Sequence, residues 1–321
     1  MQYRSLGSTG VQVSELCFGT MSFGGDADEA TSRAMFSRCR DVGINFFDTA
    51  DVYTGGKSES ILGKLIEGRR DELVIATKAH FPTGGAPTDR GSSRYHLVRA
   101  VEASLRRLNT DRIDVLYLHH YDAQTALEDT LKSLELLVQQ GKILYPAASN
   151  FGAWQVMRAL GIAEGRGWAK LACLQPMYNL AKRQAEVEIL PMAQEMGLGV
   201  CSYSPLAGGL LTGKYQSQSA EGRLKVNAAY KVRYGEPGNF EIAAALTSLA
   251  KELGHHPASL AVAWVGSHPG ITAPILGARN LEQLEPSLGA LEVKMTPELR
   301  ERLSRLSPAP APANDRTEER R

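Results

Sequence analysis

The sequence lacks the features that mark several classes of protein. Only four of its 321 residues are cysteine, and Cys17, Cys39, Cys173 and Cys201 are far apart, with no CxxC pair. This spacing predicts neither a disulfide framework nor a zinc site, so we expect reduced thiols and no bound metal. No apolar run approaches the roughly 20 residues needed to cross a bilayer. The N-terminal MQYRSLGSTG lacks the charged head and apolar stretch of a signal peptide.

Neither positive nor negative charge is in excess. Lys and Arg number 36, Asp and Glu number 35, and the formal net charge is +1. A nucleic-acid-binding surface needs a basic excess or stripe, so we expect no nucleic acid and no membrane among the partners. Hydrophobic residues make up 43% of the chain, which is enough for a large core. These observations favour a cytoplasmic enzyme that acts on a small molecule.

Eight short apolar segments recur along the chain. Their length and their content of Val, Ile, Leu and aromatic residues predict strands that are buried on both faces. Amphipathic segments lie between them and predict helices, such as 28–43, which has an acidic start and a glycine stop. The predicted strands are LCFGT (16–20), INFFD (44–48), LVIATK (73–78), IDVLYLH (113–119), ILYPAAS (143–149), LACLQ (171–175), LGVCSY (198–203) and ITAPIL (271–276).

This alternation predicts an α/β fold with a parallel sheet. Eight units favour a (β/α)8 TIM barrel over a doubly wound sheet, and no GxGxxG follows any strand. The start, YRSLGSTGVQV, predicts an N-terminal β-hairpin outside the repeat. The long interval 204–270 predicts an inserted loop and an extra helix, so we expect extra helices in the C-terminal part. We expect one barrel domain over 1–306 and a disordered tail over 307–321, rich in Pro, Ala and charge.

Polar side chains end most of the predicted strands. Functional groups of such a barrel lie at the carboxyl ends of its strands. A single Lys or Asp there is more often a structural ion pair or turn residue, but polar ends on most of the eight strands indicate a site. The candidates are Asp48, Lys78, His119, Ser149, Asn150, Gln175, Tyr203 and Ser204.

Several blocks of the sequence resemble the aldo-keto reductase superfamily, in the same order and over roughly residues 3–290. FDTADVYTGGKSESILGKLI (47–66) resembles the family signature around its Asp and Tyr. YSPLAGGLLTGKY (203–215) and the GTMSFGG segment look most like the branch that contains bacterial reductases and potassium-channel β-subunits. Further matching blocks lie at 74–78, 94–122, 137–151 and 275–284.

The resemblance implies a catalytic tetrad of Asp48, Tyr53, Lys78 and His119, and the reduction of an aldehyde or ketone to an alcohol. Tyr53 would protonate the carbonyl oxygen while a hydride moves from nicotinamide C4 to the carbonyl carbon. A phenol with a pKa near 10 is a slow donor, and the Lys78 ammonium should lower that pKa. Asp48 would keep Lys78 charged. His119 would orient the carbonyl and hydrogen-bond the developing oxyanion.

The same resemblance implies that NADPH lies across the barrel mouth. Ser149, Asn150 and Gln175 would bind its carboxamide, and Tyr203 would stack on the nicotinamide. Cationic residues of the set would favour a 2′-phosphate, hence NADPH over NADH. The full implied set is Thr20, Met21, Asp48, Ser149, Asn150, Gln175 and Tyr203 at the nicotinamide end, and Ser204, Pro205, Leu206, Gly208, Lys214, Arg223, Gly277, Arg279 and Gln283 around the phosphates and adenine.

The sequence departs from the family pattern at two places. Pro286 and Ser287 stand where the family usually has a Glu-Asn pair that contacts adenine. Ala147, preceded by Pro146, replaces the usual glycine before the Ser-Asn pair. A backbone shift there would move the two carboxamide ligands.

Two other functions fit parts of the sequence. Lys78 at a strand end would suit the Schiff-base nucleophile of an aldolase-type barrel. Alternatively, the chain would be an NADPH-binding regulatory subunit with vestigial catalysis. His119 argues against this second reading, because the channel β-subunits carry Asn at the matching place. The sequence makes no prediction of oligomeric state.

Overall fold

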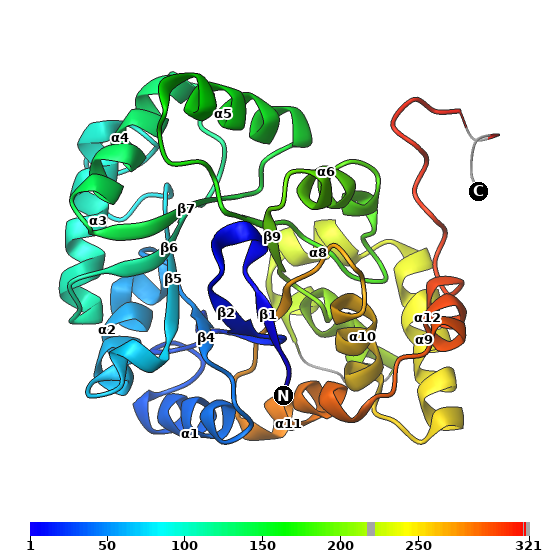
Figure 1. Cartoon of the computed structure of the whole chain (residues 1–321). Coiled ribbons are helices and arrows are strands. Elements are labelled where there is room, and N and C mark those ends of the chain that lie inside the picture. The colour runs from blue at the N-terminus through cyan, green and yellow to red at the C-terminus, as the bar shows by residue number, and fades with distance from the viewer. Residues whose placement is uncertain (217–221, 317, 319–321) are drawn as a thin grey trace.

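A closed barrel of eight parallel strands forms the centre of the protein. The computed structural model describes residues 1–216, 222–316 and 318. The strand order around the barrel is β10-β3-β4-β5-β6-β7-β8-β9, which confirms the predicted (β/α)8 fold. Figure 1 shows the helices arranged around these strands. The strands are β3 (Cys17–Gly19), β4 (Phe46–Asp48), β5 (Val74–Ala79), β6 (Ile113–Leu118), β7 (Ile143–Ser149), β8 (Cys173–Gln175), β9 (Gly199–Ser202) and β10 (Ala273–Leu276).

Helices surround the barrel, and their ends follow the sequence signals. Asp28 caps the first of them by accepting a hydrogen bond from the Thr31 N–H, and His256 caps another through Ala258 N–H. The helices that follow the strands are α1 (Glu29–Asp41), α2 (Lys57–Ile66), α3 (Arg94–Leu108), α4 (Leu127–Gln139), α5 (Ala153–Arg166), α6 (Ile189–Glu195), α10 (Pro257–Gly266) and α11 (Leu281–Leu288), with α12 (Pro297–Ser304) after them.

The interval between β9 and β10 carries an insertion with extra helices, as expected, and it holds more than one of them. Before α10 the described residues form α7 (Arg223–Val226), α8 (Ala228–Tyr234) and α9 (Pro237–Leu253). The side chain of Asn227 caps α8, and Pro237 occupies the first turn of α9. These two start signals divide the insertion into short helices.

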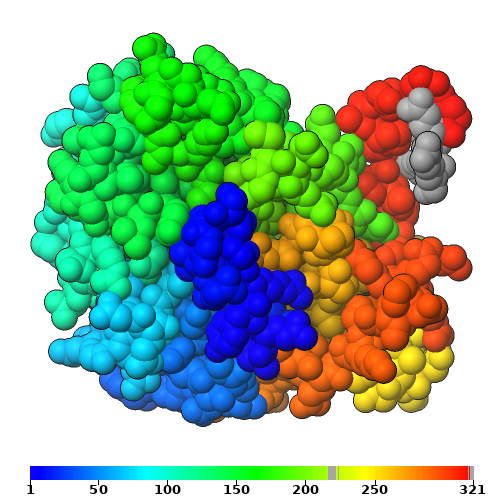
Figure 2. Space-filling model, in the orientation of Figure 1, coloured from blue at the N-terminus to red at the C-terminus, as the bar shows by residue number. Residues whose placement is uncertain are grey.

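The N-terminal hairpin closes one end of the barrel. Its strands β1 (Tyr3–Ser5) and β2 (Gln12–Ser14) are antiparallel, as predicted. It contacts residues that precede barrel strands: Ser14 N–H donates to Asn45, and Arg4 donates to the Ile271 carbonyl. Figure 2 shows the hairpin filling the middle of this face. The functional end must therefore be the opposite one, where the strands finish.

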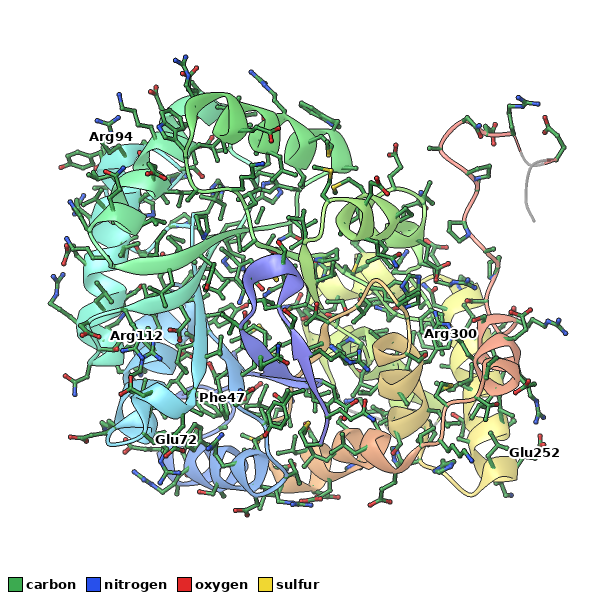
Figure 3. The ribbon with its side chains drawn as sticks, viewed as in Figure 1. Phe47, Glu72, Arg94, Arg112, Glu252 and Arg300 are labelled. Atoms are coloured by element: carbon green, nitrogen blue, oxygen red, sulfur yellow. The ribbon has the colours of Figure 1, made fainter. Side chains whose placement is uncertain are left out.

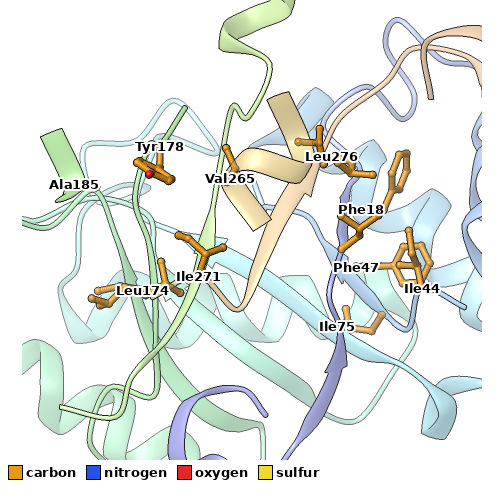
Figure 4. Close-up of a cluster of buried hydrophobic side chains, with 14 of the residues drawn as sticks. Phe18, Ile44, Phe47, Ile75, Leu174, Tyr178, Ala185, Val265, Ile271 and Leu276 are labelled. Carbon is orange, nitrogen blue, oxygen red and sulfur yellow. The ribbon is translucent and has the colours of Figure 1, made fainter. Parts of the chain in front are cut away.

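Alternation along the strands divides the core into two layers. Residues that point into the barrel form one buried cluster: Leu6, Val13, Cys17, Phe46, Ala76, Val115, Tyr117, Ala147, Cys173, Cys201, Ala273 and Ile275. Their neighbours point outward and pack beneath the helices. Figure 4 shows part of this outer layer, including Phe18, Phe47, Ile75, Leu174 and Leu276.

The outer surface of the helices is charged. Glu72, Arg94 and Glu252 are exposed at the periphery of the molecule (Figure 3). After α12 the chain runs away from the barrel, and residues 308–316 form no helix or strand (Figure 1).

Across the described residues, the helices are all too short or too polar to cross a bilayer.

Candidate active site

The predicted strand-end side chains converge because of the two-residue period of a strand. Six of the eight follow an inner-core residue by two positions, which returns them to the face that points into the barrel. The pairs are Phe46–Asp48, Ala76–Lys78, Tyr117–His119, Ala147–Ser149, Cys173–Gln175 and Cys201–Tyr203. The polar residues thus form a layer above the apolar interior, at the end of the barrel away from the hairpin.

Lys78 is the centre of this layer and is completely buried. Its ammonium donates hydrogen bonds to Asp48 Oδ1, to the Thr49 carbonyl at 2.7 Å and to the Tyr53 hydroxyl at 3.3 Å. Burial works to lower the pKa of Lys78, but Asp48 and Tyr53 outweigh it and the pKa is raised. The amine therefore stays protonated at neutral pH.

Tyr53 lies on the turn that follows β4, in the short helix η2 (Tyr53–Gly56). The Lys78 amine is 4.9 Å from the centre of its ring, and the ring of His119 is 5.9 Å away in an edge-on arrangement. Burial raises the pKa of the phenol, and the opposing charge of Lys78 only partly offsets this. Lys78 thus lowers this pKa as expected, but desolvation of the phenolate is the larger effect, so the net pKa of Tyr53 is raised.

His119 is a neutral imidazole at physiological pH. Burial, followed by the charge of Lys78, lowers its pKa to about 2. The Phe81 ring packs edge-on against it at 4.8 Å between ring centres. Its buried Nδ1 has no hydrogen-bond partner among the described residues. A neutral imidazole carries one N–H, so His119 is suited to donate a hydrogen bond rather than a proton.

The side chains assigned to the carboxamide form one hydrogen-bonded chain with the tetrad. Ser149 Oγ donates to the Gln175 carbonyl at 3.0 Å, and Gln175 Nε2 donates to Asp48 Oδ2 at 2.9 Å. The Tyr203 hydroxyl donates to Asn150 Oδ1 at 2.8 Å. Asp48 therefore holds Gln175 as well as Lys78, a link that was not predicted.

The departure from the family pattern in β7 leaves that strand intact. β7 runs unbroken through Pro146 and Ala147, which pair with Leu116 of β6 and Cys173 of β8. Ser149 remains opposite Gln175. The register of β7 therefore places the Ser-Asn pair at the end of the strand, next to Gln175.

The loop after β9 has a tightly turned backbone. Ser204 and Ala207 have positive φ, and the Ala207 and Gly209 N–H groups donate to the Ser204 and Leu206 carbonyls within the loop. Gly208 and Gly209 are also left-handed. A Cβ at Gly208 would lie 2.5 Å from the Tyr230 ring, and one at Gly209 would lie 3.2 Å from the Lys214 amine. Glycine is needed here, and it brings Lys214 against the loop.

The other predicted phosphate and adenine contacts lie around the loop before α11. Apart from its chain neighbours, no atom of the described residues lies within 4 Å of a Cβ built on Gly277. Arg279 pairs with Asp26 at 3.0 Å, and its N–H donates to Gln283 Oε1. Ser287, by contrast, is buried, so the position does not present a polar side chain at the surface.

Three predicted contacts have distinct environments. Thr20 is buried and its hydroxyl lies 2.8 Å from Ser58 Oγ, within the framework of the β4–α2 loop. Met21 is 38% exposed. Ser204 has a left-handed backbone and precedes Pro205. The side chain of Arg223 lies outside the described residues.

Three groups that lie behind the site were not predicted from the sequence. The Thr49 carbonyl that binds Lys78 is a backbone atom, which no side-chain motif signals. Glu59 and Asp51 are buried carboxyls next to the catalytic loop. Their only signal is the acidic pattern within DTADVYTGGKSE, where charge at a loop normally indicates solvent exposure.

Comparisons with known proteins agree with this geometry. The model of the Aldo/keto reductase family matches residues 15–307. An "Uncharacterized oxidoreductase YrpG" of Bacillus subtilis (strain 168) is 40% identical over 321 residues, covering 97% of both chains.

Two plant proteins are also similar. Each bears the name "Probable voltage-gated potassium channel subunit beta" and is 36% identical. The one from Arabidopsis thaliana matches over 306 residues, or 91% of this chain and 92% of its own. The one from Oryza sativa subsp. japonica matches over 314 residues, or 93% and 94%. The chain therefore belongs to the aldo/keto reductase family, and it is an oxidoreductase of that family's (β/α)8 barrel type.

Proposed function

We propose that this protein reduces an aldehyde or ketone to an alcohol with NADPH, and that Tyr53 supplies the proton. The observation that carries the proposal is the buried Lys78 ammonium, which contacts Asp48 and the Tyr53 hydroxyl together. NADPH, when bound, supplies the hydride from its nicotinamide C4. The side chains of this protein carry out the proton transfer and stabilise the charges that form.

Tyr53 donates its phenolic proton to the carbonyl oxygen as that oxygen gains negative charge. The completely buried ammonium of Lys78 stabilises the phenolate left behind. Asp48 balances the charge of Lys78 and fixes its direction. His119 is neutral, so its N–H can donate to the same oxygen without competing as the acid.

The donor set fits the cofactor. The amide of Gln175 contacts Asp48 and that of Asn150 contacts Tyr203, and the two amides would bind a carboxamide and fix the face of the nicotinamide ring. The left-handed loop at 207–209 and the adjacent Lys214 amine would hold the phosphates. Arg279 would bind the 2′-phosphate that distinguishes NADPH from NADH.

Replacing Arg279 by Ala should weaken NADPH binding selectively. Loss of a charge-assisted contact to the 2′-phosphate is worth roughly 1.5–3 kcal/mol, or about 10- to 150-fold in Kd. NADH, which lacks that phosphate, should bind the variant within about threefold of the wild type. Fluorescence titration with both cofactors measures the two constants. An equal loss for NADPH and NADH would remove Arg279 from the 2′-phosphate site.

The charge on Lys78 argues against the aldolase reading. A Schiff-base nucleophile must be a neutral amine, whereas Asp48 and Tyr53 keep this one protonated. Treatment with borohydride and a carbonyl substrate, without NADPH, should leave Lys78 unmodified. Peptide mass analysis that finds reductive alkylation at Lys78 would favour the aldolase reaction instead.

The names of the two plant relatives favour a regulatory subunit as the second candidate function. The two candidates differ in turnover, since both would bind NADPH. The test is NADPH oxidation against a panel of aldehydes, ketones and sugar carbonyls. Reductive turnover supports the enzyme, whereas NADPH binding without turnover on the whole panel supports the regulatory function.

A further inference from the structure

We propose that Asp51 is a positioning residue whose protonation state controls how readily Tyr53 releases its proton. The proposal rests on the proposed function, since it concerns the acid of that reaction. Asp51 lies between Asp48 and Tyr53 on the loop after β4. Its backbone N–H donates to the Lys78 carbonyl at 3.1 Å, so the loop is anchored on the strand that carries the catalytic amine.

The carboxyl group of Asp51 is isolated. The residue is 2% exposed, and neither carboxyl oxygen has a hydrogen-bond partner among the described residues. A buried carboxylate without a partner is costly, so such a group favours its neutral form. Asp51 therefore differs from the other carboxyl of the site, Asp48, whose oxygens bind Lys78 and Gln175.

The arginine whose charge acts on Asp51 is paired with another acid. Arg107 of α3 donates through Nε to Glu59 Oε2 at 2.6 Å, and Thr77 donates to Glu59 Oε1 at 2.6 Å. Glu59, on α2, is completely buried and faces Asp51 as a like charge. Two buried carboxyls thus lie near one guanidinium. Arg107 is hydrogen-bonded to Glu59 and not to Asp51.

A cavity of about 320 Å³ lies beside this cluster and gives Asp51 a route for proton exchange. Asp51 and His96 line it together with Arg106 and Arg107 of α3. Its other charged walls are Asp89 with Arg99, which pair with each other, and Glu102, which pairs with Lys142. Arg99 is more than half exposed, so the cavity reaches the surface.

These surroundings set the direction of the effect. Burial first, and then Glu59, raise the pKa of Asp51 to about 7, against the smaller opposing charges of Arg107 and Lys78. Asp51 is neutral below that pH and ionised above it. An ionised Asp51, two residues before Tyr53 on the same loop, repels the negative charge of the Tyr53 phenolate, so Tyr53 becomes a weaker acid and carbonyl reduction slows as pH rises through about 7.

The kinetic test compares pH profiles of kcat/KM between pH 5.5 and 8.5 at saturating NADPH. The wild type should fall roughly three- to tenfold through an inflection near pH 7, as expected for about one pKa unit of coupling to the acid. Asp51→Asn cannot ionise and should stay near the acidic plateau. The matched control Glu102→Gln neutralises a carboxyl on the same cavity wall and should keep the inflection. An Asp51→Asn profile that retains the inflection would overturn the proposal.

A second measurement detects the effect of Asp51 on the pKa of Tyr53 without an activity assay. Tyrosine Cζ signals in a ¹³C-labelled protein, with Tyr53→Phe for assignment, give the pKa of Tyr53 in the wild type and in Asp51→Asn. Removing the charge should lower that pKa by roughly one unit. An unchanged pKa refutes the role of Asp51, even where turnover is normal. A shifted pKa in a protein without reductase activity would refute the proposed function and leave this coupling standing.

Discussion

Tyr53→Phe is expected to lower kcat/KM for carbonyl reduction by roughly 10²- to 10⁴-fold, the usual contribution of a positioned general acid. The substitution removes the hydroxyl that lies 3.3 Å from the Lys78 amine and leaves the ring in its place. NADPH should bind within about threefold of the wild type, because the residues assigned to the cofactor are untouched. Steady-state kinetics and fluorescence titration measure the two quantities on the same preparation.

Tyr95→Phe provides the matched control for this substitution. Tyr95 lies on α3 and is 60% exposed, so loss of its hydroxyl should not alter turnover. The assignment of the acid would fail if Tyr53→Phe retained activity within tenfold of the wild type, which corresponds to only about 1.4 kcal/mol in the barrier.

Lys78→Met is expected to destabilise the fold as well as abolish turnover. The change leaves Asp48 as a buried carboxylate without its cation, and breaking a buried pair in this way typically costs about 3–5 kcal/mol. Without the ammonium, the phenolate of Tyr53 also loses its main source of stabilisation. Urea denaturation gives the free energy of unfolding, and the NADPH assay gives the activity.

The double variant Lys78→Met/Asp48→Asn separates these two effects. Asparagine is neutral and keeps an oxygen that can accept from Gln175, so the double variant should regain much of the lost stability. Its activity should stay as low as that of Lys78→Met. A double variant no more stable than Lys78→Met would mean that the unpaired charge of Asp48 is not the cause of the destabilisation.

The fold was predictable because the eight apolar segments differ so clearly from the amphipathic segments between them. Which face of each strand points inward was harder to read. Phe46 and Phe47 are both large and apolar, yet Phe46 fills the barrel and Phe47 lies beneath the helices. The site resolves the ambiguity, because a polar residue two positions after Phe46 marks the inner face.

The rest depends on contacts that one sequence does not encode locally. Glu59 pairs with Arg107, which is 48 positions away in the sequence, and this pairing leaves the Asp51 carboxyl without a hydrogen bond from that arginine. Gln175 reaches Asp48 across 127 positions. The number of helices between β9 and β10 depends on single capping residues such as Asn227, whose signal is weak beside the apolar pattern.

Transfer of deuterium tests the central claim most directly. The protein is incubated with an aldehyde that it turns over and with NADPH deuterated at the transferring C4 position, and the alcohol is analysed by mass spectrometry. The account predicts one deuterium on the carbinol carbon, strict preference for one face of the nicotinamide, and loss of product formation in Tyr53→Phe. Alcohol without deuterium, or product formation by Tyr53→Phe at the wild-type rate, would contradict it.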